Sequence, residues 1–312
     1  MRKKHFLFAS VLALLCGSST LHAQDFKLTS SGYFKNQGVD VMAFDDIYPE
    51  GHQGGVCIIM NGHRVATNGD IRLEATPGQW QPVPKQLDRK LGDNSITATL
   101  CYPDSSRHLT GFNPMIYPDL HLIYTVNVES KGKNIEVTVD LDRPIPQEFI
   151  GKVGFNLEFF PGSLFGKPWI MDGQSGIFPQ QPNSPLMTTQ PNYLHTGNYH
   201  DGKKSLADMN KLIGKGYSPI VADDIISEPY AKGTKFTSRP DDPYNKVTIE
   251  SLSGDLQLFD GRMNHNNGWF VLRSNIKPGV TKGAVKWIIT PNVVADWMYQ
   301  PVIRSEEHTS EL

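Results

Sequence analysis

Residues 121–160 read HLIYTVNVESKGKNIEVTVDLDRPIPQEFIGKVGFNLEFF, and this stretch decides the fold. Apolar and polar residues alternate in three segments, at 122–128, 135–141 and 153–159. A period of two residues is typical of β-strands with one buried face. The polar turn at 130–133 joins the first two segments into a predicted hairpin, and the third extends it into an antiparallel meander. The apolar face of this meander needs a second layer to cover it.

Further strands are predicted on both sides of this stretch. Asn-Gly is the strongest short hairpin signal, and it occurs at Asn61-Gly62 and Asn68-Gly69, which predicts a second meander over residues 56–75. Residues 161–204 lack a periodic pattern, and residues 205–213 have the pattern of a short helix. We therefore predict an all-β protein, a large antiparallel β-sandwich with long loops and at most one or two short helices, over residues 24–303.

The two ends of the chain have sequences unlike a folded domain. Residues 2–4 are basic, residues 6–16 are apolar, and Leu21-His22-Ala23 ends in a small residue, which predicts a signal peptide over residues 1–23. This signal predicts export to the periplasm, outer surface or exterior of a Gram-negative bacterium. Residues 304–312 look like the translation of a sequencing adapter, so we expect that the natural chain continues beyond Ile303.

Composition excludes several classes of function. The chain has 312 residues and a formal net charge of -2, without runs of Lys and Arg, so no nucleic-acid partner is expected. Apart from the signal peptide, no apolar run approaches the ~20 residues of a transmembrane helix. The ten His residues show no ligand spacing, and there is no phosphate loop or dinucleotide motif, so no metal and no cofactor are predicted. Cys57 and Cys101 either form a disulfide or remain two buried thiols.

Aromatic and polar residues in the predicted loops indicate contact with carbohydrate. Sugar rings lie on aromatic side chains, while their hydroxyls pair with neighbouring polar groups. The candidate sugar-binding residues are Trp169, Asp172, Trp269, Asn266 and His200. The alternative is that these tryptophans pack in the core, as most do. Trp287, which alternates with apolar neighbours, is predicted to be a core residue, and no catalytic residue is assigned.

Two segments resemble a known family. Residues 153–161 running into 166–169, and residues 268–271 through 288–293, are similar to the N-terminal β-sandwich of large secreted bacterial glycoside hydrolases related to family 9. This resemblance implies that an immunoglobulin-like module and an (α/α)6 catalytic barrel follow downstream in the natural chain. The first interpretation is therefore a non-catalytic accessory domain, whose partners are a polysaccharide or oligosaccharide and the missing catalytic domain.

Two other interpretations remain open. The chain could be a self-contained carbohydrate-active enzyme of the mutarotase or lyase type, with His200, His121 or Glu158 as acid or base. It could also be a surface glycan-binding protein without activity.

Overall fold

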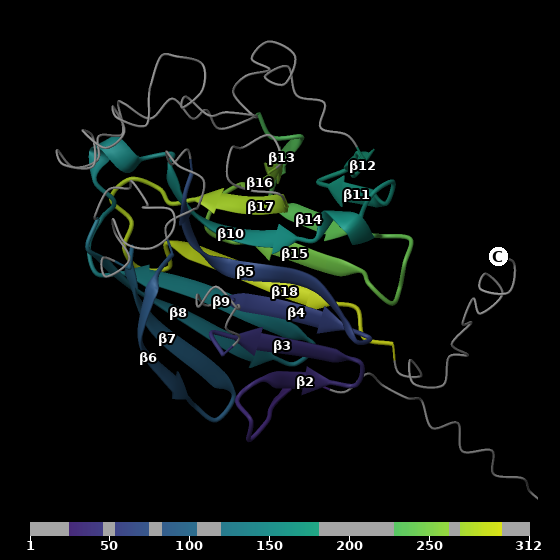
Figure 1. Cartoon of the computed structure of the whole chain (residues 1–312), viewed down its shortest axis with the longest axis horizontal. Coiled ribbons are helices and arrows are strands. Elements are labelled where there is room, and N and C mark those ends of the chain that lie inside the picture. Colours follow the sequence, from purple (N-terminus) through teal and green to yellow (C-terminus); the bar gives the residue numbers. More distant parts are fainter. Residues whose placement is uncertain are drawn as a thin grey trace, which may run out of the picture.

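The computed structural model describes residues 25–45, 54–74, 83–104, 120–180, 228–261 and 269–294. These residues form two nine-stranded antiparallel sheets that pack face to face (Figure 1). The described part contains no α-helix, only the short 3-10 helices η2 (Gln147–Phe149) and η3 (Pro161–Ser163). The predicted all-β sandwich is confirmed. The predicted signal peptide, the helix at 205–213 and residues 304–312 lie outside the described residues.

The first sheet has the strand order β1-β2-β3-β4-β5-β10-β17-β16-β13. Its strands are β1 (Lys27–Leu28), β2 (Phe34–Asn36), β3 (Val39–Ala43), β4 (Val56–Met60), β5 (His63–Leu73), β10 (Val153–Phe159), β17 (Phe270–Asn275), β16 (Leu256–Asp260) and β13 (Ala231–Gly233). The second sheet has the order β12-β11-β14-β15-β18-β9-β8-β7-β6. Its strands are β12 (Gln174–Ile177), β11 (Pro168–Met171), β14 (Lys235–Ser238), β15 (Val247–Ser251), β18 (Val285–Pro291), β9 (Asn134–Leu141), β8 (Leu122–Lys131), β7 (Ser95–Tyr102) and β6 (Lys85–Leu91).

The hairpin predicted from the opening stretch is confirmed, but the meander is wrong. Strands β8 and β9 pair up to Lys131 and Asn134 around the predicted turn. Strand β10 then pairs with β5 and β17 in the other sheet, because the segment after Leu141, with η2, carries the chain across the sandwich. Two-residue alternation is the same in either sheet, so the sequence pattern could not assign β10.

The second Asn-Gly pair is also not a turn between strands. Asn61-Gly62 forms the tight turn between β4 and β5, and both residues have positive φ. Asn68 and Gly69 instead lie inside β5, where the pairing with both β4 and β10 shifts register. Only Asn68 of this pair has positive φ, at 54°. The strand therefore continues through a β-bulge, a feature that re-aims side chains.

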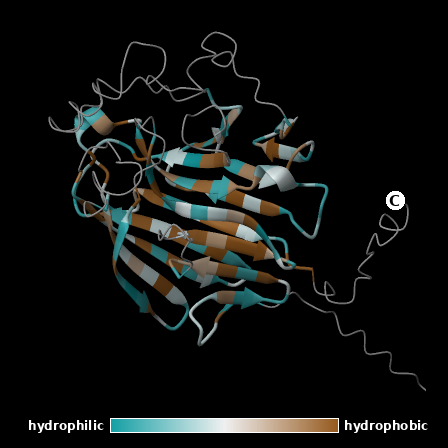
Figure 2. Ribbon diagram, in the orientation of Figure 1, coloured by the Kyte–Doolittle hydropathy of each residue, from teal (hydrophilic) through white to brown (hydrophobic). Residues whose placement is uncertain are grey.

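The core lies between the apolar faces of the two sheets. The rings of Phe155 and Trp287 meet edge to face at 5.0 Å, and those of Phe159 and Phe236 at 5.9 Å. The indole Nε1 of Trp287 donates to Ser274 Oγ at 3.0 Å. Trp287 is completely buried, which confirms it as a core residue. Figure 2 shows the alternation of apolar and polar residues along the strands that this arrangement requires.

The two cysteines lie in different sheets. Cys57 is buried on β4 of the first sheet, and Cys101 lies on β7 of the second. The structure draws no disulfide between them, and Cys101, unlike Cys57, is only half-buried. Whether the pair forms a disulfide stays a prediction. In the described part of the chain, no helix is long and apolar enough to cross a membrane.

Candidate functional site

Charged residues lie in the middle of the first sheet, on the face turned away from the second sheet. On β5 and the residue after it, Asp70, Arg72 and Glu74 alternate with Ile71 and Leu73. Ile71 and Leu73 belong to the core between the sheets. The three charged side chains therefore share the opposite face of the strand.

Strands β10 and β17 continue this face. Asn156 pairs with Asp70 across β5 and β10, and Arg273 pairs with Asn156 across β10 and β17. Directly paired residues lie on the same side of a sheet. We call this set the charged face, and its members are Asn68, Asp70, Arg72, Glu74, Asn156, Glu158 and Arg273. Each of these residues is at least nine-tenths buried.

One end of the charged face is a closed set of contacts. Arg273 Nη1 donates to Asn156 Oδ1 at 2.7 Å, and Asn156 Nδ2 donates to Glu74 Oε1 at 2.9 Å. The guanidinium also lies 3.9 Å from the Glu74 carboxylate, and it donates to Asn275 Oδ1 and to the carbonyl of Lys152. We call this end, formed by Glu74, Asn156 and Arg273, the far end. We interpret it as structural, because its charges are paired and each of the three guanidinium nitrogens of Arg273 has an acceptor.

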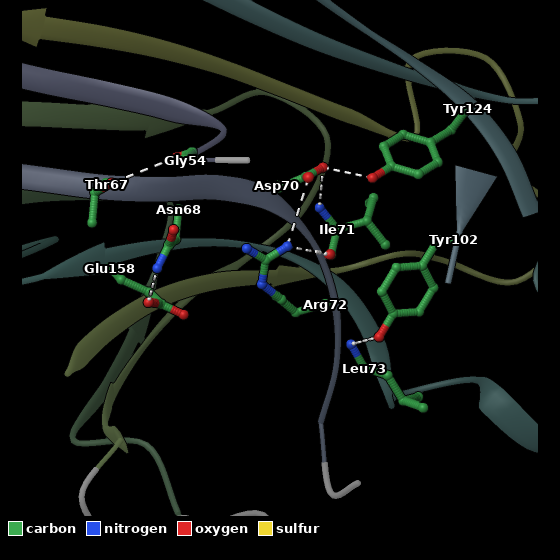
Figure 3. Close-up of polar contacts among 10 residues, drawn as sticks. All are labelled: Gly54, Thr67, Asn68, Asp70, Ile71, Arg72, Leu73, Tyr102, Tyr124 and Glu158. Carbon is green, nitrogen blue, oxygen red and sulfur yellow. Dashed lines mark hydrogen bonds and ion pairs between the residues drawn. The ribbon is translucent and has the colours of Figure 1, made fainter. Parts of the chain in front are cut away.

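The other end of the charged face, formed by Asn68, Asp70, Arg72 and Glu158, is called the near end. It is arranged around Arg72 (Figure 3). Its Nη1 donates to the carbonyl of Ile71 at 2.9 Å and lies 3.6 Å from Asp70 Oδ2. On the other side of the guanidinium, Asn68 Nδ2 donates to Glu158 Oε2 at 2.7 Å (Figure 3). The bulge at Asn68 gives this contact its direction, since it falls where β5 shifts register. One guanidinium thus lies between two buried carboxylates.

Two tyrosines of the second sheet reach this end of β5. Strand β4 pairs with β5 only as far as Gly69, and none of the described strands pairs with the edge of β5 beyond that residue on that side. The amide N–H of Leu73 donates instead to the hydroxyl of Tyr102, at 3.0 Å. The hydroxyl of Tyr124 donates to Asp70 Oδ1 at 2.7 Å. These contacts connect the near end of the charged face directly to the second sheet.

Burial shifts the proton equilibria of the near end. It raises the pKa of Asp70 to about 6, although the charge of Arg72 and the hydrogen bond from Tyr124 act to lower it. Burial, together with the neighbouring Asp70 carboxyl, raises the pKa of Tyr124 well above its usual range. A carboxyl that changes its protonation state near pH 6 beside a fixed cation is typical of functional sites.

The near end also keeps hydrogen-bonding capacity that the described residues do not use. Asn68 Oδ1 and Asp70 Oδ2 are buried, and neither accepts a hydrogen bond within the described part of the chain. Among the same residues, the Arg72 guanidinium makes one hydrogen bond, to the carbonyl of Ile71, and one longer ion pair, to Asp70 at 3.6 Å, although a guanidinium has five donors. Buried polar groups are almost always paired, so these groups indicate a place for water or a ligand.

An aromatic pair lies on the same side of the sheet, beyond Glu158. Phe159 pairs with Phe270, so the neighbouring residues Phe160 and Trp269 fall on the side of the charged face. Their rings meet at 5.3 Å, and Phe160 is 52% exposed. The pair presents apolar surface that a ligand could cover, with the polar groups of the near end further along the strands.

The structure separates the sugar-binding residues predicted from the sequence. Trp269 belongs to the aromatic pair. Trp169 lies on β11 in the core of the sandwich and is 6% exposed. The carboxylate of Asp172 accepts hydrogen bonds from the amides of Thr234 and Lys235 at 2.6 and 2.9 Å, so it holds the turn after β11 against β14. Neither Trp169 nor Asp172 belongs to the sheet that carries the charged face.

The remaining candidates are distributed as follows. Asn266 and His200 lie outside the described residues. His121 is exposed at the start of β8, and its carbonyl accepts a hydrogen bond from Arg143. Glu158, named as a candidate acid or base, belongs to the charged face. Sugar binding by these residues stays a prediction.

Sequence reasoning missed Asn68, Asp70, Arg72 and Tyr124. The alternation in Asp70-Ile71-Arg72-Leu73-Glu74 was the available signal, but it is the same as that of a solvent-exposed strand face. Within the part of the chain that the structure describes, no group of three or more His, Cys, Asp or Glu residues is placed to hold a metal ion.

Comparison with known proteins yields low similarities only. The sequence matches no protein family profile and no curated protein. A galactose mutarotase related enzyme from Lactobacillus acidophilus is 10% identical with a TM-score of 0.32, over 83% of this chain and 96% of that one. A GalM/aldose epimerase homologue from C. elegans is 9% identical with a TM-score of 0.30, over 86% of this chain and 98% of that one. Similarities this low do not place the chain in a family, and the relation to family 9 glycoside hydrolases, the missing catalytic domain and the export signal stay predictions.

Proposed function

We propose that this protein is a carbohydrate-active β-sandwich protein that binds a sugar at the near end of its charged face. The observation that supports this most directly is the unused hydrogen-bonding capacity of Asn68, Asp70 and Arg72. Asn68 Oδ1 and Asp70 Oδ2 are acceptors, and the Arg72 guanidinium is a donor. A sugar hydroxyl both donates and accepts, so adjacent hydroxyls match such a set.

The aromatic pair supports a sugar over other polar ligands. The C–H face of a pyranose ring can lie on Phe160 or Trp269, and its hydroxyls can then reach toward Glu158 and Arg72. The charged face contains the carboxylates of Asp70, Glu74 and Glu158 against two guanidinium groups. A face with this excess of carboxylates disfavours a polyanion such as a nucleic acid.

The contrast between the two ends of the charged face argues against a purely structural role. Buried ions are costly, and a fold that keeps them pairs them fully. The far end meets this condition through Asn156, Glu74 and Arg273. The near end meets it only in part, which is expected where a ligand completes the hydrogen bonds.

Acid–base chemistry on the bound sugar is a second candidate function. Asp70 has a pKa of about 6 and therefore exchanges its proton near neutral pH, and Arg72 lies between it and Glu158. This combination favours a self-contained enzyme over a non-catalytic accessory domain. Interconversion of freshly dissolved anomers, followed by polarimetry, and release of unsaturated products from uronate polymers, followed by absorbance, test the mutarotase-like and lyase-like alternatives separately.

Sugar binding can be tested on the whole chain by calorimetry and tryptophan fluorescence, with a panel of monosaccharides and of plant and host oligosaccharides. We expect at least one member to bind, and Trp269→Ala and Phe160→Ala to weaken it by about threefold to tenfold through loss of the stacking surface. Leu252→Ala is the matched control, because Leu252 is 53% exposed and lies beyond the end of β15 in the second sheet. Absence of binding to the whole panel, or equal affinities in all three variants, would contradict the proposal.

A further inference from the structure

The two oxygens of the Asp70 carboxyl have different surroundings. Oδ1 accepts two hydrogen bonds, from the hydroxyl of Tyr124 and from the amide of Ile71, each at 2.7 Å. Oδ2 accepts none from the described residues and lies 3.6 Å from Arg72 Nη1. The two donors on Oδ1 fix the plane of the carboxyl, so that Oδ2 is the oxygen left for a ligand or a proton.

We propose that Asp70 holds a hydroxyl of the bound sugar through Oδ2, and that Tyr124 of the opposite sheet is the residue that positions this carboxyl. This inference rests on the proposed sugar-binding function and adds two residues with distinct roles. When Asp70 is ionised, Oδ2 accepts the hydrogen of the sugar hydroxyl. When Oδ2 takes up a proton from solvent, it becomes a donor, and the same hydroxyl must turn to accept. No covalent bond of the sugar changes in either state.

Four of the described strands bring charged or titratable groups to the surroundings of Asp70. Strand β5 supplies Arg72, and β10 supplies Glu158, which shares that guanidinium. Strands β8 and β7 supply the hydroxyls of Tyr124 and Tyr102. Arg72 and the Tyr124 hydrogen bond lower the pKa of Asp70, and burial raises it by more. Removing the Tyr124 hydroxyl should therefore move the titration of Asp70 to higher pH.

Tyr102 provides a matched control. Its hydroxyl also reaches β5 from the second sheet, but it accepts from the amide of Leu73 and does not bind the carboxyl. Tyr102→Phe and Tyr124→Phe each remove one buried hydroxyl, and both hydroxyls contact the same end of β5. A merely structural effect on the junction of the two sheets would appear in both variants, whereas a positioning effect on Asp70 would appear only in Tyr124→Phe.

The experiment measures the affinity for whichever panel sugar binds, between pH 5 and pH 7.5, in the whole chain. In the unmodified protein we expect affinity to rise through this range, because a carboxylate is a stronger acceptor than a neutral acid. In Tyr124→Phe the midpoint of this rise should move up by about half to one pH unit, the equivalent of one hydrogen bond. In Tyr102→Phe the midpoint should not move, and Asp70→Asn should bind more weakly with no dependence on pH in this range.

A second measurement follows the Asp70 carboxyl itself by carbon NMR of aspartate-labelled protein without sugar, with Asp70→Asn for assignment. Binding with a flat pH profile, or the same midpoint in Tyr124→Phe as in the unmodified protein, would overturn the inference and leave sugar binding intact. If no sugar binds, the proposed function and the role of Oδ2 both fail. In that case, an unchanged NMR midpoint in Tyr124→Phe would refute the positioning role as well.

Discussion

The ionisation of Asp70 should make the protein less stable as the pH rises from 4 to 7. The pKa of this buried carboxyl is raised from 3.8 to about 6 in the folded chain. The folded state therefore binds the proton more tightly than the unfolded state does. Its contribution to stability is fully present below pH 3.8 and is lost as the pH rises through about 6.

The size of this loss follows from the two pKa values. The difference between 3.8 and about 6, at 1.36 kcal/mol for each pH unit, corresponds to about 3 kcal/mol. Asp70→Asn removes the titrating group and keeps nearly the same shape. Part of this loss already occurs below pH 4, where the unfolded carboxyl begins to ionise. The free energy of unfolding of the unmodified protein minus that of the variant should therefore fall by about 2.4 kcal/mol between pH 4 and pH 7. Taking this difference cancels the titration of the other carboxylates.

Urea unfolding at half-unit steps of pH, followed by tryptophan fluorescence and circular dichroism, measures both free energies. Asp172→Asn is a control of opposite sign, because the Thr234 amide donates to Asp172 and lowers its pKa. The free energy of unfolding of the unmodified protein minus that of Asp172→Asn should therefore rise with pH through the acid range. A difference for Asp70→Asn that stays constant, or that rises between pH 4 and pH 7, would refute the assignment of a raised pKa.

Two further substitutions test the packing around the near end of the charged face by the same urea assay. In the unmodified protein the Leu73 amide donates to the Tyr102 hydroxyl at 3.0 Å. Tyr102→Phe removes this acceptor and should lower the free energy of unfolding by about 1–3 kcal/mol. An unchanged unfolding midpoint would show that water replaces the hydroxyl. Gly69→Ala would place a Cβ 2.6 Å from the Cβ of Val56 on the paired strand. This overpacking should lower the free energy of unfolding by about 1–3 kcal/mol. An unchanged free energy of unfolding would mean that β4 moves aside at the bulge.

The sequence by itself determined the class of the fold. Strict alternation in β8 and β9 indicates strands with one buried face, and the turn at 130–133 places the end of their hairpin. The turn at Asn61-Gly62 likewise places the junction of β4 and β5. The same local pattern identified Trp287 as a core residue. These properties depend on neighbours along the chain, and they can therefore be inferred from residue order alone.

Tertiary structure decided which sheet each strand joins and which polar residues are buried. Alternation is identical on a solvated face and on a covered one, so Asp70, Arg72 and Glu74 read as an ordinary outer face of β5. Their burial depends on packing, and the surroundings of Asp70 depend on Tyr124, which lies 54 residues away in the chain and in the other sheet. Likewise, only the three-dimensional contacts distinguish Trp169, buried in the core, from Trp269, which pairs with an exposed Phe160. Contacts between residues this far apart leave no periodic signal in a single sequence, because each depends on how whole strands are arranged in space.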